Sequence, residues 1–269
     1  MSITGRTTVY GLLGSPVTHS RSPRLHNGLF AHYGLDAAYL AFPVDPRTPG
    51  AALVSAIRTL GLTGANLTVP FKQRVLPHLD ALAPSASRAE AVNTITVKDG
   101  LLIGHNTDGS GLVAAVESTG HRPRRAMVAG AGGTGRAVAA ALQDHGCAVV
   151  LLNRTEARAL EVARRLGIDA GPLTPEAFSE NAVEMDIVVN CCTPAADAMV
   201  ARLDATRLPS SALWVDANYF NPQPPHSATI GGRFQPGTEM LLHQGIQAFA
   251  LWTGTTVPAA LPRQLGVAP

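Results

Sequence analysis

The chain has 269 residues, of which 46% are apolar and 15% are charged, and 21 Lys and Arg against 19 Asp and Glu leave a formal net charge of +2. This length and apolar content allow two domains with sizeable cores, and we expect two domains rather than one. The near balance of charge argues against recruitment by nucleic acid or by a membrane surface. The expected partners are therefore small molecules.

No apolar run approaches the roughly 20 residues that a membrane helix needs, and the first residues lack a signal-peptide cleavage pattern. We therefore expect a cytoplasmic protein. The three cysteines, Cys147, Cys191 and Cys192, are too few for a disulfide framework and do not have zinc-ligand spacing. The nine histidines include no His-Glu-x-x-His pair, so we expect reduced cysteines and chemistry without a metal.

Apolar runs alternate with helical patterns through the first part of the chain. The pattern predicts strands at 9–13, 38–42 and 65–69, with helices at 22–33 and 48–60, and such alternation is typical of an α/β fold. Asp99 and Gly100 then separate two β-rich runs within 94–105, which predicts a hairpin with a two-residue turn. This hairpin interrupts the parallel pattern and marks a plausible domain edge.

A second series of elements follows the hairpin. The sequence predicts a helix over 107–119, a strand over 126–129, a helix over 133–145 and strands over 148–152, 187–190 and 213–216. A final helix is expected over 238–253. The restart of the strand and helix alternation indicates a second sheet.

The segment 130–135, Gly-Ala-Gly-Gly-Thr-Gly, follows an apolar strand and opens a helix, so it fills a G-x-G-x-x-G pattern in the required context. Gly130 would permit a tight turn, Gly132 would let backbone N–H groups approach a pyrophosphate, and Gly135 would allow close packing of helix and strand. The sequence therefore predicts a dinucleotide site, although an ordinary glycine-rich turn is the alternative.

The second strand of this unit ends near residue 152, where an NAD-binding domain usually has an acidic residue for the ribose 2′-hydroxyl. The chain instead reads Asn153-Arg154-Thr155, with Arg158 one helical turn further on. Arginines at this point can pair with a 2′-phosphate, which a carboxylate would repel. This pattern favours NADP over NAD, with two solvated arginines as the alternative.

Polar residues in the first domain also allow two interpretations. Ser20 and Ser22 could bind a ligand or simply cap a helix that has Pro23 near its first turn. Lys72 is predicted in the first turn of a helix after residue 70, where the helix dipole disfavours a cation and so suits the lysine to acid-base work. An exposed lysine is the alternative there, and helix capping is the alternative for Asp108.

The order and spacing of these segments together resemble the shikimate dehydrogenase family over essentially the whole chain. The family's substrate loop is similar to residues 14–27, its catalytic-lysine segment to 66–72, and its Asn-Thr-Asp segment to 106–108. Its NADP segments are similar to 130–134 and 153–158. The resemblance implies an α/β fold class with a substrate-binding domain over 1–106, a Rossmann-type doubly wound NADP-binding domain over 107–237, and residues 238–269 packing back on the first domain.

The resemblance also implies a reaction and a set of site residues. Lys72 would transfer a proton and Asp108 would orient it during NADP-dependent reduction of 3-dehydroshikimate to shikimate. The residues implied to bind the cyclic acid are Ser20, Ser22, Thr68, Asn93, Asp108, Tyr219 and Gln244. The residues implied to bind NADP are Gly130, Ala131, Gly132, Gly133, Thr134, Asn153, Arg154, Thr155, Arg158, Ala217 and Gly237.

Two segments depart from the family's pattern. Cys191 and Cys192 bring an additional cysteine to one of them, and Pro236 and Glu239 stand where Asp and a small residue are usual in the other. These departures keep three alternatives open: a quinate dehydrogenase, an aminoshikimate dehydrogenase, and a non-catalytic NADP-binding sensor. The expected assembly is a monomer or a homodimer.

Overall fold

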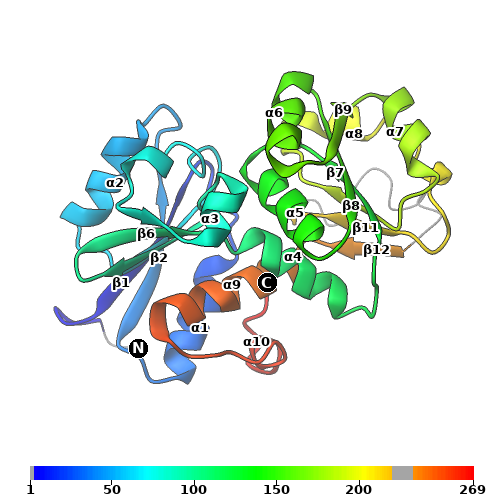
Figure 1. The fold of residues 1–269 in the computed structure, drawn as a ribbon. Coiled ribbons are helices and arrows are strands. Elements are labelled where there is room, and N and C mark those ends of the chain that lie inside the picture. The colour runs from blue at the N-terminus through cyan, green and yellow to red at the C-terminus, as the bar shows by residue number, and fades with distance from the viewer. Residues whose placement is uncertain (1–2, 220–232) are drawn as a thin grey trace. The chain divides into compact units, whose positions relative to one another are not determined.

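The computed structural model describes residues 3–219 and 233–269, and the chain forms two compact units (Figure 1). The first unit comprises Met1–Gly111 and Leu241–Pro269, and the second comprises Leu112–Met240. The chain leaves the first unit within helix α4 (Asp108–Glu117) and returns to it within helix α9 (Thr238–Thr253).

The first unit is built on a mixed sheet in the order β2-β1-β3-β5-β6-β4. Its strands are β1 (Thr8–Gly14), β2 (Ala37–Pro43), β3 (Gly64–Leu67), β4 (Ala81–Leu82), β5 (Thr94–Lys98) and β6 (Leu101–His105). Strands β2, β1 and β3 run parallel, whereas β5 is antiparallel to both β3 and β6. Asp99 and Gly100 both have positive φ, as a tight hairpin turn between β5 and β6 requires, so the predicted hairpin is confirmed.

Helices cover both faces of this sheet. Apolar side chains of α1 (Ser22–His32) and α9, with partly buried Leu261 of α10 (Leu261–Gln264), form a core against one face that includes Phe30 and Phe249. On the other face, α2 (Gly50–Thr59) and α3 (Pro84–Ala89) pack on Leu67 and Ile95. A short 3-10 helix, η1 (Leu76–His78), joins β3 to β4. The sheet thus forms the middle of three layers.

The second unit contains an entirely parallel sheet in the order β12-β11-β10-β7-β8-β9. Its strands are β7 (Arg125–Ala129), β8 (Ala148–Asn153), β9 (Asp169–Pro172), β10 (Ile187–Asn190), β11 (Leu213–Asp216) and β12 (Arg233–Pro236). Counted from β7 as the first strand, this is the order 3-2-1-4-5-6 read from one edge, which defines the doubly wound dinucleotide-binding fold. The strand order reverses between β7 and β10, so ligands are expected at the carboxyl ends of these two strands.

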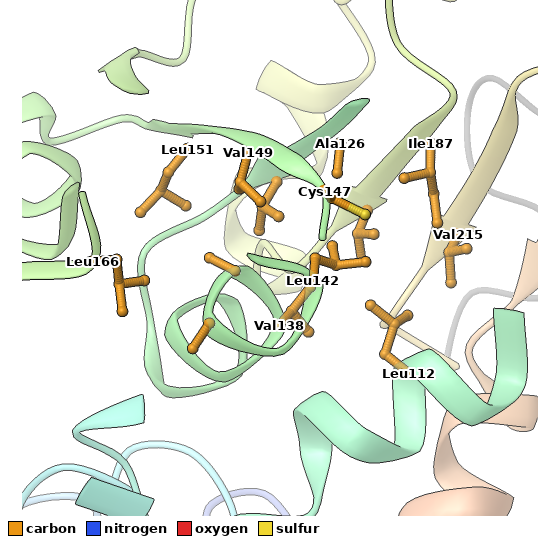
Figure 2. Close-up of a cluster of buried hydrophobic side chains, with 14 of the residues drawn as sticks. Leu112, Ala126, Val138, Leu142, Cys147, Val149, Leu151, Leu166, Ile187 and Val215 are labelled. Atoms are coloured by element: carbon orange, nitrogen blue, oxygen red, sulfur yellow. The ribbon is translucent and has the colours of Figure 1, made fainter. Parts of the chain in front are cut away.

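Two apolar cores sandwich this sheet. On one face, α4, α5 (Gly133–Asp144) and α6 (Glu156–Leu166) pack on the strands, and Figure 2 shows Leu112 of α4 and Val138 of α5 within this cluster. On the other face, Phe178 of α7 (Pro175–Ala182) packs on Trp214. The remaining short elements are α8 (Asp197–Val200) and the 3-10 helices η2 (Pro194–Ala196) and η3 (Ala205–Arg207).

The predicted fold class is confirmed, since an α/β first unit is joined to a doubly wound second unit. Strands β9 and β12 were not predicted, because Asp-Ala-Gly-Pro and Arg-Phe-Gln-Pro carry no apolar run. Among residues 3–219 and 233–269, none of the helices has the length and apolar content needed to cross a membrane.

Candidate active site

Polar residues of the first unit gather at one edge of its sheet. This edge holds the carboxyl ends of β1, β3 and β6 together with the amino end of β5, because β5 runs antiparallel to its neighbours β3 and β6. Segments that follow or precede these strand ends are therefore brought together although they lie far apart in the chain. The residues concerned carry hydroxyl, amide, ammonium and carboxylate groups.

Lys72 and Asp108 form an ion pair at this edge, with Nζ 2.5 Å from Oδ2. The side chains of Lys72 and Asp108 are only 13% and 7% exposed, so water screens their attraction weakly. Asp108 is the first residue of α4, and its backbone N–H donates to Asn106 Oδ1 at 2.9 Å. Because of this ion pair, Lys72 is not an exposed lysine, and Asp108 does more than cap a helix.

The prediction that Lys72 lies in the first turn of a helix is wrong. Residues 69–75 form consecutive turns, and the nearest regular element is the 3-10 helix η1. The carbonyl of Lys72 accepts a hydrogen bond from the backbone N–H of Val92 at 2.7 Å, which is a tertiary contact rather than a helical one. The local electrostatic partner of the lysine is therefore the Asp108 carboxylate and not a helix dipole.

Asn93 joins most of the polar residues at this edge. Its Nδ2 donates to Asp108 Oδ1 at 2.8 Å and to Thr107 Oγ1 at 2.9 Å. Its Oδ1 accepts from the backbone N–H of Thr107 at 2.8 Å and from Thr94 Oγ1 at 2.9 Å. Asn93 is 2% exposed, so these bonds fix its side chain in one orientation.

Gln244 reaches the same cluster from α9. Its Oε1 lies 3.3 Å from Asn93 Nδ2 and 3.4 Å from Thr107 Oγ1, and its Nε2 donates to the Leu241 carbonyl. Gly111 makes this approach possible, because a Cβ there would lie 2.7 Å from Gln244 Cβ and 2.8 Å from its backbone N. The structure thus brings Lys72, Asn93, Asp108 and Gln244 together.

Ser20, Ser22 and Thr68 follow the carboxyl ends of two neighbouring strands, β1 and β3. Ser20 Oγ accepts from the backbone N–H of Ser22 at 3.2 Å just before α1, whose N-cap residue is Arg21 and has no side-chain capping bond. Thr68 packs closely on Gly14, where a Cβ would lie 2.1 Å from Thr68 Cγ2. These three residues thus follow strands that end at the sheet edge where Lys72 and Asp108 pair.

Two histidines near this edge are held towards the neutral form. Burial lowers the pKa of His105, whose Nε2 lies 3.0 Å from Thr96 Oγ1, and burial also lowers the pKa of His19 in the loop after β1. Burial thus disfavours the charged form of both imidazoles.

The glycine-rich turn of the second unit connects β7 to α5. Gly130 has φ +105°, a conformation that favours glycine, and a Cβ on Gly135 would lie only 1.7 Å from the Gly130 carbonyl oxygen. A Cβ on Gly132 would meet no atom within 4 Å, so open space lies beside the start of the helix. Asn153 Oδ1 accepts from the Ala131 N–H at 3.0 Å and ties the turn to the end of β8.

These features fit a bound pyrophosphate. Gly133 and Thr134 are the first residues of α5, where the helix dipole favours an anion. Arg154 and Arg158 are exposed, and within the described residues no ion pair or side-chain hydrogen bond engages either of them. Both guanidinium groups are therefore available to a 2′-phosphate beside Asn153 and Thr155.

Ala217 and Gly237 meet at the carboxyl ends of β11 and β12. A Cβ on Gly237 would lie 2.5 Å from the Asp216 carbonyl oxygen and 2.9 Å from that of Ala217. Tyr219, half-buried, stands in the turn after β11, in the second unit. That Tyr219 binds the substrate remains a prediction.

Cys191 and Cys192, which depart from the family's pattern, directly follow β10. Cys191 packs against the core on the α5 side of the sheet, whereas Cys192 packs against the core on the α7 side. Gly130 lies against this segment, since a Cβ there would be 3.1 Å from the Cys191 carbonyl carbon. The two side chains thus pack on opposite sides of the sheet, and neither cysteine forms a disulfide among the described residues.

Sequence reasoning missed three residues that support these sites. Asn66 donates through Nδ2 to Thr94 Oγ1 and to the Asn93 carbonyl, and Tyr39 donates its hydroxyl to Asn66 Oδ1. Arg136, 4% exposed, pairs with Glu161 under the glycine-rich turn. A polar residue inside an otherwise apolar strand was the signal at Asn66, whereas Tyr39 and Arg136 gave none.

The two units together define a class of protein. A doubly wound sheet with a glycine-rich turn and free arginines suits a phosphorylated dinucleotide, and a half-buried lysine paired with a carboxylate suits proton transfer. This combination is that of a nicotinamide-dependent dehydrogenase with a separate α/β unit.

Comparison with known proteins defines the family. Residues 12–95 match the model of the shikimate dehydrogenase substrate binding domain, residues 113–219 that of shikimate / quinate 5-dehydrogenase, and residues 237–264 that of the shikimate 5'-dehydrogenase C-terminal domain. The chain is 41% identical to the shikimate dehydrogenase (NADP(+)) of Moorella thermoacetica, covering 97% of this chain and 93% of that protein.

Two solved structures are also similar. Shikimate dehydrogenase from Aquifex aeolicus superposes with a TM-score of 0.87 at 32% identity, covering 98% of this chain and 99% of that one. The Thermus thermophilus enzyme in complex with NADP(H) and shikimate gives a TM-score of 0.81 at 33% identity, with 96% and 98% covered. The chain belongs to the shikimate dehydrogenase family, as the sequence predicts.

Proposed function

We propose that the protein catalyses the reversible NADP-dependent reduction of 3-dehydroshikimate to shikimate, a step of aromatic amino-acid biosynthesis through chorismate. The chain is an NADP-dependent oxidoreductase of its family, and its relatives over almost the whole length are shikimate dehydrogenases that use NADP. The observation that carries the proposal is the Lys72–Asp108 pair, because reduction of a ketone needs one well-placed proton donor.

Lys72 is the proton-transfer group in this proposal. When bound, the nicotinamide supplies or accepts the hydride. In the reducing direction, the Lys72 ammonium gives a proton to the oxygen that was the ketone, so that an alcohol forms and the lysine is left neutral until solvent reprotonates it. In the oxidising direction the neutral amine takes the hydroxyl proton.

Asp108 positions the lysine and keeps the surrounding donors in order. Its Oδ2 holds Lys72 Nζ, while its Oδ1 accepts from Asn93. A low exposure of both charged side chains makes this attraction strong and directional. The ammonium is therefore presented at one place on the sheet edge instead of sampling solvent.

The cyclic acid is proposed to bind through hydroxyl and amide groups at the same edge. A ring with several hydroxyls and a carboxylate requires donors and acceptors of this kind. The residues proposed are Ser20, Ser22, Thr68, Asn93, Asp108 and Gln244 of the first unit, with Tyr219 of the second. The first unit, with boundaries near 106 and 238, would then be the substrate-binding domain.

NADP is proposed to bind along the carboxyl ends of the parallel strands in the second unit. The glycine-rich turn over 130–134 would hold the pyrophosphate, and residues 153–158 would hold the 2′-phosphate. Ala217 and Gly237 would complete the site at the ends of β11 and β12. We further propose that the protein is cytoplasmic and acts as a monomer or a homodimer.

Two alternatives give different outcomes in an assay. A quinate or aminoshikimate dehydrogenase would share Lys72, Asp108 and the nucleotide unit, but Ser20, Ser22 and Arg154 favour shikimate with NADP. A non-catalytic NADP sensor would bind the nucleotide without turnover, and it gives no chemical reason for a buried Lys72–Asp108 pair.

The test is the substitution Lys72→Ala. Loss of general acid-base catalysis should lower kcat on shikimate by about 10²- to 10⁴-fold, while the affinity for NADP stays unchanged because the nucleotide residues lie in the second unit. Lys98→Ala is the matched control, since Lys98 is exposed at the end of β5. A Lys72→Ala protein with near wild-type turnover would refute the assignment.

A further inference from the structure

A buried chain of hydrogen bonds leads from the Lys72–Asp108 pair back into the core of the first unit. Asp108 Oδ1 accepts from Asn93 Nδ2 at 2.8 Å, and Asn93 Oδ1 accepts from Thr94 Oγ1 at 2.9 Å. Thr94 Oγ1 accepts from Asn66 Nδ2 at 3.0 Å, and Asn66 Oδ1 accepts from the Tyr39 hydroxyl at 2.7 Å. The chain ends at Tyr39, in the middle of β2.

Donor and acceptor can be assigned for every hydrogen bond in this chain, because some of the groups can only donate and others can only accept. The ionised Asp108 carboxylate can only accept, so Asn93 must present Nδ2 to it, and the Thr107 backbone N–H, which can only donate, lies on Asn93 Oδ1. The Asn93 carbonyl, which can only accept, takes a bond from Asn66 Nδ2 at 3.1 Å. Asn66 Oδ1 therefore faces Tyr39, and the tyrosine hydroxyl is the donor that completes the series.

Tyr39 is itself held firmly in place. Asn27 clamps its backbone, with Nδ2 donating to the Tyr39 carbonyl at 2.9 Å and Oδ1 accepting from its N–H at 2.8 Å. The ring is 1% exposed and stacks on His26 at a centroid distance of 4.5 Å. A tyrosine fixed in this manner presents its hydroxyl at one point with little freedom to move.

We propose that Tyr39 is a positioning residue for the reaction, acting through Asn66, Thr94 and Asn93 on the orientation of Asp108 and Lys72. This inference rests on the function proposed above and adds a residue to it. Without the hydroxyl, Asn66 Oδ1 would be buried with no donor from Tyr39, and the amide would gain by turning towards another partner. Thr94 and then Asn93 would lose the bonds that hold the Asp108 carboxylate in its present orientation.

The experiment is Tyr39→Phe, which removes the hydroxyl and keeps the ring. Tyr10→Phe is the matched control, because Tyr10 is the buried cross-strand partner of Tyr39 on β1 and its ring also contacts Trp252. Tyr39→Phe should lower kcat with shikimate roughly tenfold, in line with one lost buried hydrogen bond. Tyr10→Phe should leave kcat within about twofold, and NADP affinity should be unchanged in both variants.

A double-mutant cycle with Thr94→Val separates positioning from a general loss of structure. Thr94→Val cuts the chain between Asn66 and Asn93, so adding Tyr39→Phe to it should cost far less in kcat than Tyr39→Phe costs in the wild type. Independent, multiplying effects of the two substitutions would overturn the proposal, as would equal kcat values for Tyr39→Phe and the wild type.

A readout without turnover keeps this inference distinct from the proposed function. The side-chain amide resonances of Asn93, measured by NMR, should shift in Tyr39→Phe and stay in place in Tyr10→Phe. If the wild type turns over no shikimate yet these resonances shift, the proposed function fails while the positioning chain stands. If shikimate is turned over but the Asn93 resonances of Tyr39→Phe match the wild type, the positioning chain is refuted.

Discussion

At the scale of single residues, Arg154 and Arg158 are proposed to set the cofactor preference. Both side chains are exposed beside the end of β8, where Asn153 and Arg154 stand in place of the acidic residue that usually binds the ribose 2′-hydroxyl of NAD, and Glu156 follows in the first turn of α6. The local partner of Asn153 is the glycine-rich turn, to which its Oδ1 is bound. An additional phosphate on the ribose could thus pair with the guanidinium groups of Arg154 and Arg158, which outnumber the one carboxylate between them, that of Glu156.

This arrangement predicts that Arg154→Ser weakens binding of NADP but not of NAD. A charge-assisted contact to phosphate contributes about 1.5–3 kcal/mol, so the Kd for NADP should rise by roughly 10- to 100-fold. The measurement is calorimetric titration of both nucleotides. Arg164→Ser serves as control, because Arg164 lies in the last turn of α6 and bonds the Leu160 carbonyl. An unchanged preference in Arg154→Ser would contradict the proposed role.

At the scale of elements, two glycines of the turn between β7 and α5 have different surroundings: Gly135 is closely packed, whereas Gly132 faces open space. Gly135 has no space for a Cβ, which would lie 1.7 Å from the Gly130 carbonyl oxygen, so it sets how closely helix and strand pack. Gly132 has φ −76°, which any residue can adopt, and open space on its Cβ side. The fold therefore does not require a glycine at position 132, and we propose that its lack of a side chain leaves space for the ligand.

Gly132→Ala should therefore weaken NADP binding with little change in stability, whereas Gly135→Ala should lower stability. Gly135→Ala should lower the free energy of unfolding by about 1–3 kcal/mol, because α5 must move away from β7. Gly132→Ala should leave Tm almost unchanged yet reduce NADP affinity at least tenfold, since its methyl group would occupy the space of the pyrophosphate. Thermal unfolding and nucleotide titration check both, and a Gly132→Ala protein with normal NADP affinity would remove the turn from the cofactor site.

The sequence allowed most of the regular elements to be predicted, since strong apolar runs and the Asp99-Gly100 turn are local signals. It failed where the structure depends on distant contacts. The helix expected at Lys72 is replaced by turns because the Lys72 carbonyl bonds Val92, and the polar strands β9 and β12 form only as additions to an existing sheet edge. The proposed roles of Asp108 and Asn93 came from resemblance to a family, whereas those of Tyr39 and Asn66 could be inferred only from the structure.

At the scale of the whole molecule, one buried histidine links folding to pH. His26 is fully buried between Tyr39, Trp252 and Phe249, and neither ring nitrogen has a hydrogen-bond partner in the described part of the chain. Burial lowers its pKa to about 3, well below the usual value of 6.5. The unfolded chain therefore binds a proton at this site more readily than the folded chain does.

Stability contributed by neutral His26 is complete above pH 6.5 and is lost as the pH falls from 6.5 towards 3. The loss is up to about 1.4 kcal/mol per pH unit in this window. His26→Phe keeps an aromatic ring and removes the titrating group, so its free energy of unfolding should fall less between pH 7 and pH 5 than that of the wild type. Chemical unfolding at both pH values measures the difference, and parallel losses in the two proteins would show that His26 does not contribute.

The proposed reaction can be followed through the nicotinamide absorbance when the protein is mixed with NADP or NAD and with shikimate or quinate. We predict rapid reduction of NADP with shikimate, and a much slower change with quinate or with NAD. Faster turnover of quinate would assign the chain to a sister activity of the family, and no change with any of the four pairs would contradict the proposed function.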